Sequence, residues 1–169
     1  MKRLSPLVLV AAGVVLVIAA LGFIWSQKLS TDPAEVPLPR RAAGLALSRE
    51  TYGAAAIQEI NQLHNLAFPL ATGAVGEYGA GPSVVLWVSG AEDVSAAAQL
   101  LADMREKIDL GRSPFKSLGE NLDGARVVYL LEGLGQRHYY FQSGNLLVWL
   151  AADRGLAEEA LAEVLDFYP

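Results

Sequence analysis

The 169-residue chain contains no cysteine. This absence excludes disulfide bonds, thiol catalysis, iron–sulfur clusters and thiolate zinc sites. It also excludes the cysteine-linked lipid anchor of a bacterial lipoprotein. Since no stray thiol is present to mispair, the composition suits an oxidising compartment outside the cytoplasm.

Histidine is almost as scarce, and the two residues, His64 and His138, lie 74 positions apart. A metal site needs three or four ligands at short spacing, so the sequence predicts no metal site. It also contains no Gly-x-Ser-x-Gly elbow, no dinucleotide-binding glycine pattern and no identifiable pair of catalytic carboxylates. We therefore predict no catalytic residues, no cofactor and a protein that is not an enzyme.

Positive charge is scarce beyond residue 41. From Ala42 onward the chain has eight basic and sixteen acidic residues, which gives a net charge of −8. Such a field repels phosphate backbones and anionic lipid headgroups. The sequence therefore predicts a domain that binds no nucleic acid and does not dock broadly on anionic membranes.

One segment lacks charge altogether. Pro6 to Trp25 is a run of 20 residues without a charged or strongly polar side chain. A helix of that length spans about 30 Å, which is the hydrocarbon thickness of a bilayer. The length of the run and its bulky end favour an uncleaved signal anchor over a cleaved signal peptide or a buried core helix. We predict a flank over 1–5 and a single-pass transmembrane helix over 6–27, with residues 6–25 in the lipid bilayer.

The charges beside this segment predict its orientation. Lys2 and Arg3 precede the segment and Lys28 follows it, so we expect the N-terminus in the cytoplasm and the next domain outside. Residues 28–41 carry three prolines, which block regular structure and predict a semi-rigid, extended linker. Residues 42–169 then form one extracytoplasmic domain.

Hydrophobic periodicity within this domain predicts an α+β fold with one antiparallel sheet, in the order α-ββ-α-βββ-α. Helices are expected over 51–64, 91–109 and 153–167. Strands are expected over 74–78, 83–89, 125–131, 136–142 and 146–151. The stretch 112–124 is expected to be a loop, and the helices are expected mainly on one face of the sheet.

Two segments resemble each other at an offset of 62 residues. Tyr78 matches Tyr140 and Trp87 matches Trp149, with equal spacing and an alanine-rich helix after each strand. The pattern suggests an internal duplication of a hairpin–helix unit, and chance similarity between two apolar strands is the alternative.

The two matched strands, 84–88 and 146–150, are apolar at every position. Such strands are typically buried on both faces of a sheet. The second face is therefore expected to be covered, either by a partner protein or by another segment of this chain.

Four residues are predicted as a binding surface. His138 and Tyr140 share one side of an aromatic strand, while Trp87 and Trp149 lie in the two apolar strands. Core packing is the alternative interpretation. His64 lies on the apolar side of a helix end, where we expect it to pack or to bond to free carbonyl groups.

These features favour a membrane-anchored, non-enzymatic protein-interaction module, such as an accessory or assembly subunit of a membrane complex that binds a protein partner. A small-molecule-binding domain is the second hypothesis, and it requires an apolar pocket near Trp87, Trp149 and Tyr140. An enzyme is the third hypothesis, and it requires His64 and His138 to meet an acidic side chain.

Overall fold

The computed structural model describes residues 36–64, 68–81 and 83–169. The predicted flank over 1–5 and the predicted transmembrane helix over 6–27 lie outside these residues, as does the linker up to residue 35. In the described part of the chain, none of the helices combines the length and the apolar composition that a bilayer crossing needs.

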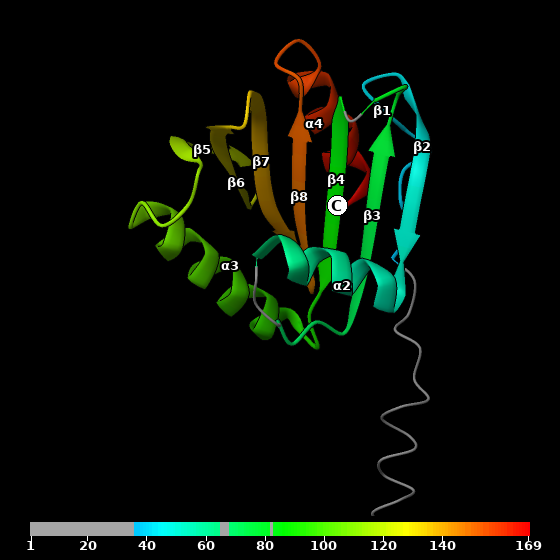
Figure 1. Ribbon diagram of the computed structural model, residues 1–169. Coiled ribbons are helices and arrows are strands. Elements are labelled where there is room, and N and C mark those ends of the chain that lie inside the picture. Colours follow the sequence, from blue (N-terminus) through cyan, green and yellow to red (C-terminus); the bar gives the residue numbers. More distant parts are fainter. Residues whose placement is uncertain (1–35, 65–67, 82) are drawn as a thin grey trace, which may run out of the picture. The chain divides into compact units, whose positions relative to one another are not determined.

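The described residues form eight strands of one antiparallel sheet (Figure 1). The strands are β1 (Arg41–Ala42), β2 (Leu45–Tyr52), β3 (Thr72–Tyr78), β4 (Val84–Gly90), β5 (Lys116–Asp123), β6 (Arg126–Gly133), β7 (Gln136–Ser143) and β8 (Leu146–Ala152). Their spatial order is β1-β2-β3-β4-β8-β7-β6-β5, and each neighbouring pair is antiparallel. The contact between β4 and β8 thus joins an early half of the sheet to a late half.

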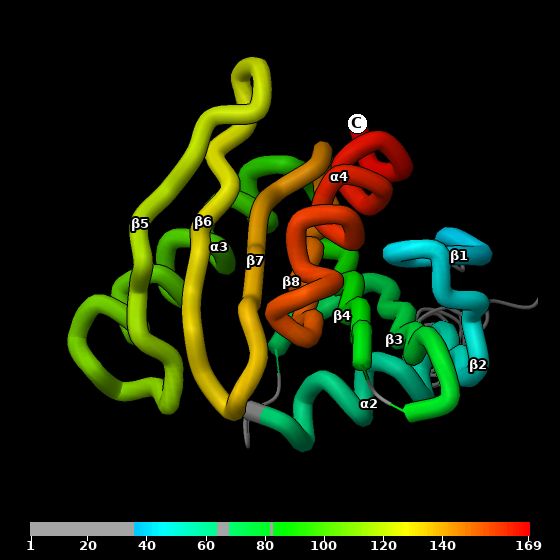
Figure 2. Tube along the Cα trace, turned by 90° about the horizontal axis from the view of Figure 1, so that it is seen from above, coloured from blue at the N-terminus to red at the C-terminus, as the bar shows by residue number. Residues whose placement is uncertain are grey.

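Three helices of the described chain cover this sheet, namely α2 (Gly53–His64), α3 (Val94–Asp109) and α4 (Ala157–Phe167). Helices α2 and α3 lie on one face, here the α2–α3 face, and α4 lies on the other, the α4 face (Figure 2). Helix α3 begins at Asp93, whose carboxylate accepts a hydrogen bond from the Ala96 N–H at 2.8 Å. It ends before Gly111, whose φ of +67° suits a residue without a side chain.

The predicted fold class and element order are wrong. Two strands, β1 and β2, precede the first helix where none was predicted, and β5 replaces the expected loop over 112–124. All eight residues of β5 are exposed, and β2 alternates only in part, between half-buried and exposed positions. A strand without a buried side shows no hydrophobic alternation, so the sequence pattern contains no signal for it.

Helices cover both faces of the sheet, with α2 and α3 on one and α4 on the other, and this explains the two strands that are apolar throughout. The side chains that point to one face, such as Leu86 and Leu150, pack in the core under α4. The side chains that point to the other face, such as Trp87 and Trp149, pack under α2 and α3. The chain itself therefore covers both faces of the central strands, and no partner protein is needed for that purpose.

The structure contradicts the predicted duplication beyond the two central strands. Strands β4 and β8 follow the offset of 62, and Trp87 pairs with Trp149 at the centre of their ladder. The flanking hairpins differ in register, because Tyr78 pairs with Val84 whereas Tyr140 pairs with Trp149. Tyr78 consequently joins the core under α4 and Tyr140 joins the core under α3. The matched segments are therefore not two copies of one hairpin–helix unit.

Residues 36–41, which we call the strap, pack on the α4 face as the chain enters the domain. Val36 and Leu38 are buried in the same core as α4, together with Ala42 of β1. This part of the predicted linker is therefore folded against the sheet. The strap makes one backbone hydrogen bond to β2 beyond the β1 pairing, from the Leu47 N–H to the Arg40 carbonyl at 3.0 Å.

Two buried tyrosines hold the strap through its proline carbonyl groups. Pro37 and Pro39 have no N–H with which to continue a strand ladder. Instead, the Tyr168 hydroxyl donates to the Pro37 carbonyl at 2.6 Å, and the Tyr78 hydroxyl donates to the Pro39 carbonyl at 3.0 Å. Burial raises the pKa of both tyrosines, so both remain donors at neutral pH. Because Tyr168 follows α4, the strap is tied to the far end of the sequence.

The hydrogen bond from Tyr168 to the strap is expected to contribute measurably to the stability of the fold. The substitution Tyr168→Phe removes the donor to Pro37 and is expected to lower the free energy of unfolding by about 1 kcal/mol. Urea unfolding of the full chain in mild detergent measures this change. Tyr129→Phe is the matched control, since its hydroxyl has a contact of 3.4 Å with the exposed Arg105. An equal loss in both variants would show that the strap contact is not specific.

Candidate functional site

Three of the four predicted binding residues meet in the middle row of the sheet. We call this the central row. It consists of one residue from each of the strands β2, β3, β4, β8, β7, β6 and β5, each paired with its neighbour across the ladder: Thr51, Val75, Trp87, Trp149, Tyr140, Tyr129 and Glu120. Cross-strand neighbours share one face, so all of them lie on the α2–α3 face. The structure therefore places Trp87, Trp149 and Tyr140 side by side.

Three rings of this row form a stack. Tyr129 and Tyr140 have centroids 4.7 Å apart with an interplanar angle of 18°, and Tyr140 and Trp149 are 5.2 Å apart at 14°. Each such pair adds about 0.5–1.5 kcal/mol to the stability gained from burial. Burial also raises the pKa of Tyr140 to about 12. The stack is thus core packing, and its outer ring, Tyr129, lies under the guanidinium of Arg105 at 5.2 Å.

His138 lies two positions from Tyr140 on β7, and both of its ring nitrogens have partners. The Trp149 Nε1–H donates to His138 Nδ1 at 3.1 Å, and His138 Nε2–H donates to the Gly133 carbonyl at 3.1 Å. This arrangement requires the neutral imidazole with its proton on Nε2. Phe115 covers the ring at a centroid distance of 4.6 Å. His138 is only 3 % exposed, and burial lowers its pKa.

The surroundings of His138 support a structural role for its ring. No acidic side chain is among the hydrogen-bond or ion-pair partners that the described residues give His138. The His64 side chain lies outside what the structure describes, so the predicted meeting of the two histidines stays a prediction. Across the described ranges, no three His, Asp or Glu side chains are grouped to hold a metal ion.

Trp87 differs from the tryptophan with which it pairs. It packs under α2 against Val75, Val85 and Ile60, and its Nε1–H is buried without an acceptor in the described part of the chain. An unsatisfied buried donor of this kind costs about 1–3 kcal/mol. The indole of Trp87 therefore contributes apolar packing but no hydrogen bond.

Neither of two sizeable surface grooves in the described residues is lined by the four predicted binding residues. The first has a volume of about 600 Å³ and is lined by Val36, Pro37, Leu38, Arg40, Ala46, Leu47, Glu50 and Tyr52. The second has a volume of about 500 Å³ and is lined by Ala98, Leu101, Ala102, Arg105, Glu106, Asp109, Leu110 and Tyr129. The small-molecule hypothesis, which requires an apolar pocket near Trp87, Trp149 and Tyr140, therefore stays a prediction.

The second groove continues onto the sheet edge, and we call the combined surface the α3–β5 corner. It consists of the groove together with Glu120 and Leu122 of β5. Glu120 pairs with Tyr129, and Leu122 pairs with Val127 on the same face. Leu122 is 76 % exposed, so an apolar side chain stands beside the groove. Sequence reasoning missed the β5 part of this surface because the stretch 112–124 was expected to be a loop.

The rim of the corner is acidic. Glu106, Asp109 and Glu120 lie around the groove, with Arg105 as their basic neighbour. Arg105 is 3.7 Å from the Asp109 carboxylate and 3.8 Å from that of Glu120, and its pKa is raised mainly by Tyr129. The corner therefore combines an apolar floor with excess negative charge.

The neutral state of His138 predicts a dependence of stability on pH. Its folded-state pKa lies below the ordinary 6.5, so the unfolded chain takes up the proton more readily. The stabilisation that the neutral His138 gives to the folded state is complete well above pH 6.5, and it is lost as the pH falls toward the folded-state pKa. We expect the free energy of unfolding to fall as the pH drops below about 6.5, and His138→Gln to reduce that fall.

Urea unfolding at several pH values measures this effect. His64→Gln is the matched control, because it removes the other histidine and leaves the His138 contribution in place. The same pH dependence in the parent chain and in His138→Gln would contradict the assignment of a neutral, buried imidazole.

Comparison with known proteins gives no family for this chain. No protein-family model matches it, and neither a curated protein nor a solved structure does. The function proposed below is therefore based on the fold and the surfaces described above.

Proposed function

We propose that this chain is a membrane-tethered, non-enzymatic protein-interaction module whose protein partner binds the α3–β5 corner. The observation that carries this proposal is the exposed Leu122 beside the groove, with Ala98 and Ala102 exposed along its wall. Exposed apolar side chains with an aromatic residue and a polar rim are typical of protein-binding surfaces.

The apolar run over 6–25 supports a location at a membrane. It carries no charge, so it is more stable in hydrocarbon than in water, and the flanking basic residues favour a domain outside the cytoplasm. Ten residues separate this run from Val36, where the strap begins, and they span at most about 35 Å. The partner is thus expected close to the same bilayer, which suits an accessory or assembly subunit of a membrane complex.

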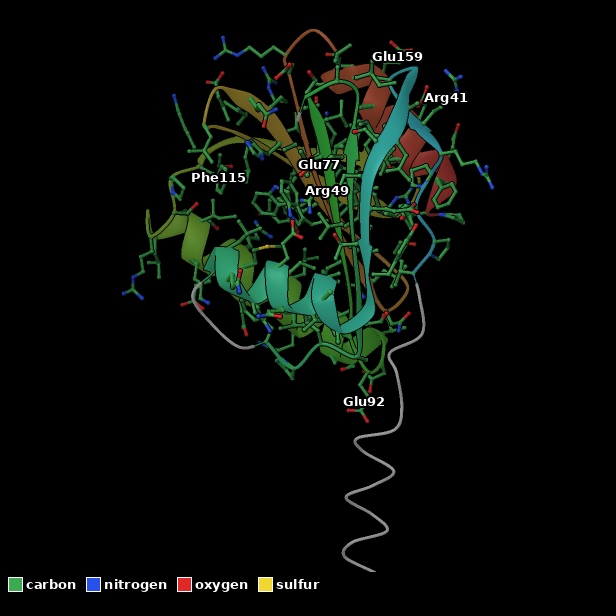
Figure 3. The ribbon with its side chains drawn as sticks, turned by 45° about the vertical axis from the view of Figure 1, so that its right-hand side comes forward. Arg41, Arg49, Glu77, Glu92, Phe115 and Glu159 are labelled. Atoms are coloured by element: carbon green, nitrogen blue, oxygen red, sulfur yellow. The ribbon has the colours of Figure 1, made fainter. Side chains whose placement is uncertain are left out.

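Two polar side chains that could carry chemistry, Arg49 and His138, are instead engaged with structural partners. Arg49 donates to the Glu77 carboxylate at 2.6 Å and to the Glu59 carboxylate at 2.9 Å, and these bonds raise its pKa (Figure 3). With His138 also engaged at both nitrogens, these groups hold elements together. They are not poised to transfer protons.

Site-specific photo-crosslinking tests the proposal. A photoreactive amino acid in place of Leu122, in the full chain within its native cells, is expected to give one discrete adduct in the membrane fraction. The adduct should remain there after extraction with alkaline carbonate, because residues 6–25 tether the chain.

Leu134 provides the matched control, since it is also 76 % exposed and lies beyond the opposite end of β6. Position 134 is expected to give no discrete adduct. Equal labelling at both positions, or no adduct at position 122, would contradict a partner at the α3–β5 corner. Release of the chain by carbonate would contradict the tether.

A further inference from the structure

We infer that the α3–β5 corner binds a basic amphipathic helix of the partner, an inference that rests on the proposed function. A partner strand that extends the sheet and a second copy of this chain are the competing occupants. The shape and charge of the corner discriminate among the three.

The edge of β5 is poorly suited to a partner strand. The pairing register shifts between Ser117 and Gly119, and Gly119 has a φ of +124°, so the strand carries a β-bulge. Lys116, Glu120 and Asp123 add charge along the same eight residues. Bulges and charged side chains are the usual features by which edge strands avoid pairing with other strands.

Charge disfavours a second copy of this chain at the corner. Three carboxylates, those of Glu106, Asp109 and Glu120, border the groove, and Arg105 already lies near two of them. Two such corners face to face would bring like charges within the screening length of about 8 Å at physiological ionic strength. Each domain also carries a net charge of −8 from Ala42 onward, which adds to the repulsion.

A helix with apolar and basic faces fits the same surface. The groove runs beside α3, and Leu101, Leu110 and Tyr129 supply apolar area on which side chains at helical spacing can pack. The exposed Leu122 extends this area onto β5. Lysine or arginine side chains on the flanks of the partner helix would lie against Glu106, Asp109 and Glu120. The partner is therefore expected to bind as a helix packed beside α3.

The experiment uses the full chain in nanodiscs of zwitterionic lipid and a defined probe. The probe is a synthetic helical peptide of leucine and lysine, with leucine on one face and one photoreactive leucine. We expect crosslinks to concentrate on residues 98–110 and 120–129. The charge reversal Glu106→Lys with Asp109→Lys is expected to reduce crosslinking about tenfold, equivalent to about 1.4 kcal/mol of binding free energy.

Matched controls separate local charge from net charge. Glu158→Lys with Glu159→Lys changes the net charge equally on α4, at the opposite face of the sheet, and is expected to leave crosslinking at the corner unchanged. A leucine–glutamate peptide of the same length is expected not to react there. Circular dichroism confirms that each variant is folded.

The inference is overturned if the crosslinks are spread over the surface, or if both charge reversals reduce crosslinking equally. It is also overturned if the acidic peptide reacts equally well, or if chain-to-chain adducts form in place of peptide adducts. Failure of the inference remains distinct from failure of the proposed function. A cellular adduct at position 122 without peptide labelling of the corner refutes the basic helix alone. Peptide labelling without a cellular adduct refutes the proposed function.

Discussion

The antiparallel contact between β4 and β8 is the constraint on which the rest of the structure depends. All seven residues of each strand pair with the other, and almost every side chain is apolar. Burial of one such side chain stabilises the fold by about 1.5–3 kcal/mol, so both faces of the pair must be covered. Helices α2 and α3 cover one face, and α4 covers the other with the strap.

In this arrangement the residues that stabilise the centre of the sheet differ from those that are exposed for binding. The aromatic residues and His138 look chemically versatile in the sequence, yet the structure uses them to fill and order the centre of the sheet. Trp149 illustrates the point, because its ring stacks on Tyr140 while its N–H fixes the tautomer of His138. Several exposed apolar side chains, such as Leu110 and Leu122, lie instead at the end of α3 and on the edge strand β5. Recognition is therefore expected at the edge of the sheet.

Hydrophobic spacing predicted the elements with a well-buried side and missed the strands at and near the two edges of the sheet. Helix α3 and strands such as β4 and β8 occupy positions at which hydrophobic spacing predicted an element. Strand β5 has no buried residue, and β2 lies near the other edge, so neither gives a usable pattern. Because these strands change the order of elements, the fold class built without them was wrong.

The predicted duplication and, over residues 36–41, the predicted extended linker were wrong for physical reasons that the sequence pattern does not show. The equal offset of 62 arises from β4 and β8 alone, because the two hairpins differ in turn length and therefore in register. The prolines of the strap block strand pairing, yet they leave their carbonyl groups free to accept hydrogen bonds from tyrosine hydroxyls. The four predicted binding residues lie close together, but their role in binding stays a prediction.

Native-state hydrogen exchange of the full chain tests the central claim most directly. If both faces of β4 and β8 are sealed by the chain itself, their amide protons exchange only through global unfolding, with the free energy found from urea denaturation. The amides of β5 that face away from β6 should exchange far faster. Exchange of the β4 and β8 amides through a lower-energy opening, at the rate of the edge strand, would contradict the account.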